Sequence, residues 1–124
     1  MLGTITDAGC VPNIYTLWSL LHTNGSARLI WSIGGICQSM LANPTSTAKA
    51  DVTRRATVLQ RVVDLNTQLA TICSHYSQCR FDGNAVFNTV FTTSDVNTRD
   101  YFHPSTSGQA KLAAVTWSAG FWGP

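Results

Sequence analysis

The feature that most constrains the fold is a long helical repeat between about Thr47 and Cys73. Small, apolar and amide side chains recur there every three to four residues, which aligns them on one face of a helix of about seven turns. The members of this stripe are Val52, Ala56, Leu59, Val63, Asn66, Ala70 and Cys73. We expect the stripe to face a core and the charged residues of the segment to lie away from it. Those residues are Asp51, Arg54, Arg55, Arg61 and Asp64.

Spacing and turn signals give the order of the remaining elements. The first is a helix through Ile14, Leu17, Trp18 and Leu21, followed by a helical stretch from Leu29 to Leu41 that is interrupted at Gly34-Gly35. After the long helix come two short strands, Cys79-Arg80-Phe81 and Ala85-Val86-Phe87, around a turn at Asp82-Gly83-Asn84. A polar loop then runs from Thr92 to Asp100. Ahead of these elements, Ile5 and Val11 suit short extended pieces.

The last helix is expected to start near Thr106. The run Thr106-Ser107-Gly108-Gln109 matches a capping box, in which a hydroxyl at the helix start and an amide three residues later satisfy free backbone N–H groups. Its buried face would consist of Ala110, Ala113, Ala114 and Trp117. Because most of these side chains are small, we expect that face to pack closely on a sheet.

Helices outnumber strands in this order, and short extended runs separate the long helices, which is typical of an α/β protein. At 124 residues the chain is long enough for one modest core, so we expect a single domain over 1–124. The strands are too few to make a complete sheet. The sequence therefore predicts a truncated α/β fold.

Composition narrows the classes of function. Charged residues make up only 11% of the chain, against about 25% in a typical soluble protein, and the net charge is +2. The basic residues are scattered instead of forming a stripe, so no nucleic-acid partner is expected. No apolar run reaches the roughly 18 residues that cross a bilayer, so no integral membrane segment is expected. The N-terminus shows no signal peptide.

The four cysteines of this Ser- and Thr-rich chain suit an oxidising compartment. Cys73 and Cys79 bracket a short segment where a helix turns into a strand, and a local disulfide there would close the turn. For Cys10 and Cys37 two alternatives stay open: they pair, or either one is free. A zinc site would require Cys or His ligands at set spacing, and the three histidines offer none, so a structural disulfide is favoured over a metal site.

The segment Asp100-Tyr101-Phe102-His103-Pro104 is the most suggestive of chemistry. Serine hydrolysis needs an imidazole beside a hydroxyl, together with a carboxylate that fixes the tautomer of the ring. A tight turn can bring an Asp three residues upstream back onto the Nδ1–H of a His. Pro104 disfavours the helical region for His103 and keeps it in a loop. On spacing alone, an exposed loop histidine near an acidic residue is the simpler interpretation.

The residues around this pair closely resemble the last block of the SGNH, or GDSL-type, lipase and esterase superfamily. In that block Asp-x-x-His is followed by Pro and by a polar helix start with Gly and Gln, as in 100–114 here. Val11-Pro-Asn-Ile-Tyr-Thr-Leu-Trp18, the long helix with Asn66, and Cys79-Arg-Phe-Asp-Gly83 also look like secreted bacterial members. The resemblance covers nearly everything from about Val11 onward.

The resemblance implies the C-terminal half of a flavodoxin-like three-layer sandwich. It implies carboxylic ester hydrolysis by an acyl-enzyme route, with Asp100 as the triad acid and His103 as the general base. It also implies a small acyl ester or a lipid as substrate, a secreted or extracellular location, and no metal or organic cofactor.

The chain departs from the family in what it lacks. It contains neither the Gly-Asp-Ser block that supplies the nucleophile nor the Gly-x-Asn-Asp block that supplies an oxyanion donor, and Asn84 lies in the wrong order and place for that donor. Loss of a triad nucleophile costs on the order of 10⁶ in turnover. Ser105 and Ser107 are the candidate substitutes, although Ser105 is only two residues beyond His103 and both serines suit capping of the last helix.

A half-domain would also leave apolar helix faces and a sheet edge without cover. We therefore expect a homo-oligomer, formed through a sheet edge or through tryptophan surfaces, with one or two of the tryptophans in the core. The tryptophans are Trp18, Trp31, Trp117 and Trp122. The alternative function is a catalytically inactive, self-associating fragment or interaction module that keeps the family's helices without a working nucleophile.

Overall fold

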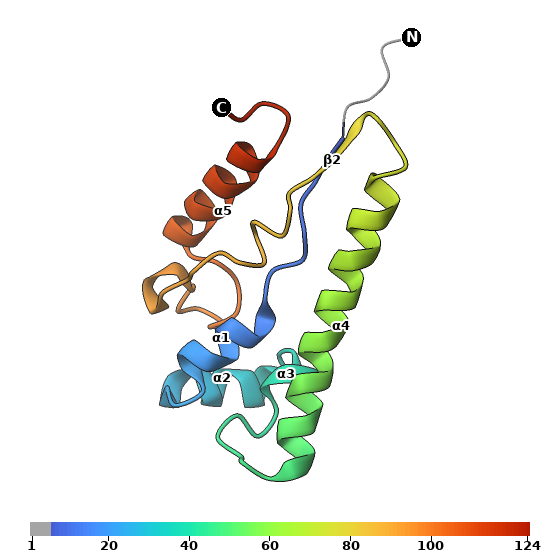
Figure 1. The fold of residues 1–124 in the computed structure, drawn as a ribbon. Helices are drawn as coiled ribbons and strands as arrows, with labels where there is room; N and C mark the ends of the chain where they lie inside the picture. The colour runs from blue at the N-terminus through green and yellow to red at the C-terminus, as the bar shows by residue number, and fades with distance from the viewer. Residues whose placement is uncertain (1–5) are drawn as a thin grey trace.

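A computed structural model describes residues 6–124 as a helix-rich α/β fold with two short strands (Figure 1). The elements in chain order are β1 (Thr6–Ala8), α1 (Ile14–Leu21), α2 (Gly25–Gly34), α3 (Gln38–Leu41), α4 (Lys49–Cys73), β2 (Cys79–Phe81), the 3-10 helix η1 (Thr93–Asp95) and α5 (Thr106–Ala119). The strands pair in parallel, with Thr6 opposite Cys79 and Ala8 opposite Phe81. The α/β class is confirmed. The extended piece expected at Ile5 lies outside the described residues.

The helices are arranged around the segments that carry the strands. In Figure 1, α4 and α5 flank those segments, and α1, α2 and α3 gather at the end where α4 begins. Of the helices within residues 6–124, none combines the length and apolarity needed to cross a bilayer.

The core lies among α1, α2 and α3. Trp31, Met40 and Leu41 are its largest fully buried side chains, and Leu17 and Leu21 of α1 pack with them. The predicted interruption of the helical stretch is confirmed. Helix α2 ends at Gly34 because Gly35 takes a left-handed backbone, at φ 60°, which only glycine adopts without a steric penalty.

The long helix is confirmed, but its buried face is turned from the expected one. Asn66 and Cys73 are buried as expected, whereas Val52, Ala56 and Val63 are exposed. The buried positions include Arg55, which the sequence placed off the stripe, and Val62, which was not among the stripe residues. Helices α1 and α3 pack against α4 and select this face.

Burial of Arg55 corrects the expectation that it faces away from the core. Its side chain is only 3% exposed, and its guanidinium lies 4.5 Å from the centroid of the Trp18 ring. Arg55 Nη2 also donates to the carbonyl of Ser46 at 2.7 Å. Stacking on an aromatic face and a hydrogen bond to a carbonyl partly offset the cost of burying the charge. Trp18 is held in turn by a 2.8 Å bond from its Nε1 to Pro44 O.

An extended segment leads from β1 to α1 and is clamped against α4 by Asn66. The backbone N–H of Val11 donates to Asn66 Oδ1 at 2.6 Å, and Asn66 Nδ2 donates to Val11 O at 3.0 Å. The side-chain amide thus pairs with both polar groups of one residue, as a neighbouring strand would. One residue earlier, the N–H of Cys10 donates to Asp82 Oδ2. These bonds satisfy a segment that belongs to no sheet or helix.

The strand expected at Ala85-Val86-Phe87 is wrong; this segment forms turns. Gly83 and Asn84 both take left-handed backbones, and the Asp82 carboxylate accepts the N–H groups of Asn84 and Val86. Because a side chain takes up these N–H groups, they are not available to a strand ladder.

Helix α5 begins at Thr106 as expected, but two details differ. The N-cap is Ser105, whose Oγ accepts the N–H of Gly108, so the capping box predicted to start at Thr106 is wrong. The predicted buried face, Ala110, Ala113, Ala114 and Trp117, is exposed. Close packing comes instead from Gly108, where a Cβ atom would clash with the carbonyl oxygen of Asp95 in η1.

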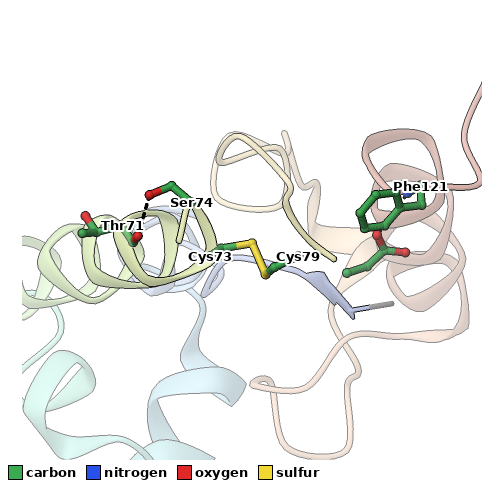
Figure 2. Close-up of a disulfide and its surroundings, with 6 residues drawn as sticks. Thr71, Cys73, Ser74, Cys79 and Phe121 are labelled. Atoms are coloured by element: carbon green, nitrogen blue, oxygen red, sulfur yellow. Dashed lines mark hydrogen bonds between the residues drawn. A yellow bond between two sulfur atoms is a disulfide. The ribbon is translucent and has the colours of Figure 1, made fainter. Parts of the chain in front are cut away.

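The disulfide between Cys73 and Cys79 is confirmed and joins the end of α4 to the start of β2 (Figure 2). Cys10 and Cys37 are both free thiols, which settles the alternatives left open by the sequence. Burial raises the pKa of the Cys10 thiol to about 11, so this sulfur is protonated and unreactive at neutral pH. Among the tryptophans, Trp31 is buried, whereas Trp117 and Trp122 are each 62% exposed.

The clamp on Val11 can be tested by Asn66→Leu, which keeps the side-chain size and removes both hydrogen bonds. The backbone N–H and C=O of Val11 would then lack partners at a site where Asn66 is 3% exposed. We expect a loss of about 2–4 kcal/mol in the free energy of unfolding, measured by urea denaturation. Gln68→Leu on the exposed side of the same helix is the matched control. Equal stability of the two variants would show that the clamp contributes nothing.

Candidate functional site

The loop between η1 and α5 brings Asp100 and His103 into contact. His103 Nδ1 lies 2.6 Å from Asp100 Oδ2, and Asp100 Oδ1 accepts the backbone N–H groups of Phe102 and His103 at 2.9 and 3.1 Å. The loop closes on itself through a 2.8 Å bond from Asn97 N–H to His103 O. Both carboxylate oxygens are therefore engaged by the same tight turn.

The surroundings of Asp100 keep it ionised. Its partial burial raises the pKa of the carboxyl, but the hydrogen bonds from the His103 ring and from the backbone N–H groups of Phe102 and His103 outweigh this effect and lower it. An ionised carboxylate can only accept a hydrogen bond, so Nδ1 of His103 is the protonated ring nitrogen. In the neutral ring, Nε2 then carries the free lone pair of a base.

Tyr101 gives the turn its shape. Its φ is +54°, a left-handed backbone that is uncommon for a bulky residue. The core holds this conformation, because the indole Nε1–H of the buried Trp31 donates to Tyr101 O at 3.0 Å. The N–H of Tyr101 donates to Asn97 O at 2.9 Å. A core side chain thus fixes the residue that separates Asp100 from Phe102 and His103.

An apolar cavity of about 430 Å³ lies beside the imidazole. Its walls come from α1, α4, α5 and the loop that carries His103. Residues lining it include Leu17, Leu20, Val62, Phe102, His103 and Leu112. The exposed His103 ring, which is 69% accessible, forms part of the rim. A cavity of this size and polarity can receive an apolar group next to a base.

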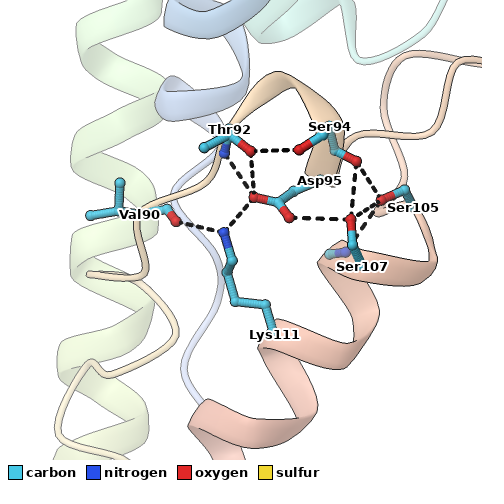
Figure 3. A network of polar contacts seen from close by, with 8 residues as sticks. Val90, Thr92, Ser94, Asp95, Ser105, Ser107 and Lys111 are labelled. Atoms are coloured by element: carbon cyan, nitrogen blue, oxygen red, sulfur yellow. Dashed lines mark hydrogen bonds and ion pairs between the residues drawn. The ribbon is translucent and has the colours of Figure 1, made fainter.

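The two candidate nucleophiles lie at the start of α5, in the network of Figure 3. Ser105 Oγ donates to Ser94 O at 2.8 Å, and Ser107 Oγ lies 2.9 Å from it. Ser107 Oγ is also within hydrogen-bond distance of Ser94 O and of Asp95 Oδ1. Within residues 6–124, no serine hydroxyl is hydrogen-bonded to the His103 ring. The structure therefore brings Asp100 and His103 together but does not bring either serine to them.

Asp95 and Lys111 form a second charged pair that the sequence did not single out. Asp95 is only 4% exposed, and Lys111 Nζ lies 2.5 Å from its Oδ2 and 3.1 Å from Val90 O. The hydrogen bond from Lys111, followed by that from the N–H of Thr92, lowers the pKa of Asp95 to about 2. Thr92 and Asp95 also cap η1 reciprocally. Their Thr-x-x-Asp spacing is the capping-box pattern that could have marked this site.

This second pair fixes the loop that carries the histidine. The N–H of Ser105 donates to Asp95 O at 2.8 Å, and Val96 pairs with Pro104 in an antiparallel bridge. Both ends of the segment 96–104 are therefore anchored next to Asp95. In the part of the chain that the structure describes, no three His, Cys, Asp or Glu side chains are grouped as metal ligands.

Comparisons with known proteins give no match: no protein-family model, curated protein or solved structure is significantly similar to this chain.

Asp95→Asn tests the electrostatic anchor through its pH dependence. Because folding lowers the pKa of Asp95 from 3.8 to about 2, its ionisation stabilises the fold above about pH 4. This contribution is lost as the pH falls from 4 towards 2. We expect Asp95→Asn to be less stable than the unmodified chain at pH 6, with the difference shrinking by pH 3, as measured by urea denaturation. Asp64→Asn, whose carboxylate bonds to the exposed Gln60 side chain, is the control. A pH-independent difference would contradict this account.

Proposed function

We propose that this chain acts in the hydrolysis of carboxylic esters, with His103 as general base and Asp100 as the residue that orients it. The observation that carries the proposal is the 2.6 Å contact between His103 Nδ1 and Asp100 Oδ2 beside an apolar cavity. A carboxylate that holds Nδ1–H leaves Nε2 free to accept a proton. The cavity would receive the apolar part of an acyl ester or of a lipid.

The reaction would proceed by acyl transfer. Nε2 of His103 takes the proton of a hydroxyl as its oxygen attacks the ester carbonyl carbon, and the ionised Asp100 stabilises the imidazolium that forms. The imidazolium then gives this proton to the departing alcohol oxygen as the ester C–O bond breaks. A water molecule repeats the sequence on the acyl intermediate and releases the acid.

A relationship to the SGNH superfamily belongs to the same proposal. The chain would correspond to the C-terminal half of a flavodoxin-like sandwich, supported by its parallel strand pair and by Asp-x-x-His placed just before α5. The buried Asn66 of α4 belongs to the long helix on which the sequence resemblance to this superfamily partly rests. A secreted location is supported by the Cys73–Cys79 disulfide, which is stable in an oxidising compartment.

The presence or absence of a working nucleophile distinguishes the proposed hydrolase from the alternative function. Use of Ser105 or Ser107 would require its hydroxyl to leave the polar network at the start of α5. The alternative, a catalytically inactive interaction module, is favoured by the lack of a hydrogen bond between His103 and a serine in the described residues. Labelling with a fluorophosphonate, followed by peptide mass spectrometry, separates the two. A labelled serine supports the hydrolase, and no labelling supports the module.

His103→Ala tests the proposed base. We expect the unmodified chain to hydrolyse p-nitrophenyl butyrate and His103→Ala to show only the background rate, because no other group would accept the hydroxyl proton. Asp100→Asn should lower the rate by at least about 10², since an amide no longer fixes the required tautomer.

His75→Ala is the matched control, because His75 is also exposed but lies in the turn after α4, away from the Asp100 loop. Its rate should equal that of the unmodified chain. If His103→Ala and His75→Ala retain the same rate, the hydrolysis comes from ordinary surface histidines and the proposed site is wrong.

A further inference from the structure

The cavity beside His103 has a buried floor and an exposed rim. The floor includes Leu17 of α1, Val62 of α4 and Val96 beyond η1, each no more than 9% exposed. The rim includes the ring of His103, which is 69% exposed. A flat apolar patch would accept any apolar surface, whereas a hollow with a floor limits its occupant to a small molecule or a single chain.

Two half-buried polar side chains at the start of α1, Asn13 and Thr16, also line the cavity. Asn13 Oδ1 accepts the N–H of Tyr15 at 3.1 Å and so caps α1. Within residues 6–124, neither Asn13 Nδ2 nor the Thr16 hydroxyl makes a hydrogen bond. Both groups can donate a hydrogen bond, so they suit an occupant that carries an acceptor oxygen, such as a carbonyl.

The ionised groups near the cavity disfavour an anionic occupant. Asp95 lines it, but Lys111 and Thr92 already bond to its carboxylate. Asp100 holds the His103 ring at the rim and stays ionised. A second carboxylate placed at the same rim would be repelled by Asp100 whenever the imidazole is neutral. The charges therefore favour a neutral head group over a carboxylate.

The volume of the cavity sets the size of the occupant. In a protein interior, a cavity of about 150 Å³ holds one benzene molecule, which has six carbon atoms. In the same proportion, 430 Å³ has room for about seventeen carbon atoms. Because solvent occupies part of the space at the open rim, a chain of about ten carbons fits within it.

We propose that this cavity binds one straight acyl chain of about ten carbons, carried by a neutral carboxylic ester. The chain lies against Leu17 and Val62, and the ester carbonyl oxygen accepts hydrogen bonds from Asn13 Nδ2 and the Thr16 hydroxyl. As a statement about the substrate, this inference rests on the proposed function. Binding itself requires neither turnover nor a nucleophile, so it can be measured separately.

Straight-chain methyl ketones test the binding, because they carry a carbonyl and an alkyl chain but no ester bond that could be cleaved. Isothermal titration calorimetry at pH 8 would compare 2-hexanone, 2-octanone and 2-decanone. We expect the affinity to rise about tenfold for each two added methylene groups. Sodium decanoate should bind at least about tenfold more weakly than 2-decanone. Affinity that does not rise with chain length, or tighter binding of decanoate, would overturn the proposal.

Asn13→Asp tests the proposed donor, because an aspartate keeps the oxygen that caps α1 and loses the N–H of the amide. We expect 2-decanone to bind at least about threefold more weakly, and a similar loss for Thr16→Val, which keeps the side-chain size. Asn24→Asp is the matched control: Asn24 caps α2 through Ala27 N–H and does not line the cavity. Equal affinity of Asn13→Asp and Asn24→Asp would show that Asn13 does not hold the carbonyl.

Cys37 shows where the ligand binds without any substitution. It is a half-buried free thiol that lines the cavity, whereas the other free thiol, Cys10, is buried and protonated. Saturating 2-decanone should slow alkylation of Cys37 by iodoacetamide severalfold. Binding that leaves this rate unchanged would place the ligand elsewhere and contradict the proposal.

The ketone measurements and the ester assays fail independently. Hydrolysis that depends on His103, without binding that depends on chain length, would leave the proposed function standing and remove this inference. Chain-dependent binding that protects Cys37, without hydrolysis, would support this inference and remove the hydrolase.

Discussion

The pairing of Asn66 with the backbone of Val11 is the contact on which the arrangement of the elements most depends. Val11 lies in the extended segment between β1 and α1, so its position decides where the strand pair and the first core helix stand relative to α4. A two-stranded parallel sheet has little stability of its own. The amide of one helical residue supplies, by hydrogen bonding, part of the support that further strands would supply in a larger sheet.

The chain has few charged residues and also leaves part of its apolar surface exposed. The core is centred on α1, α2 and α3, while α4 and α5 extend beyond it and expose apolar side chains such as Ile72 and Trp117. The cavity beside His103 is likewise walled by α1, α4 and α5 without being filled by them. The imidazole itself is largely exposed at the rim, so only the interior of the cavity is apolar.

Several parts of the fold that depend on local sequence were predicted, although the strand at 85–87 was not, and those that depend on distant contacts were missed. Periodicity located α4, and the spacing of Cys73 and Cys79 gave the disulfide. The burial of Arg55 could not be predicted, because the stacking partner is the ring of Trp18, far away in the chain. At the site, local spacing pointed to the contact between Asp100 and His103. The buried pair of Asp95 and Lys111 was missed because its partners lie 16 residues apart.

The left-handed backbone of Tyr101 makes the geometry of the Asp100 and His103 side chains a property of the whole core. An isolated peptide with this sequence would relax towards ordinary dihedral angles, because the steric cost of the turn would no longer be offset by the indole of Trp31. The two side chains therefore stay aligned only while α2 remains folded. A change in the packing around Trp31 would therefore alter the alignment of the Asp100 and His103 side chains, although the Trp31 indole bonds only to the carbonyl of Tyr101.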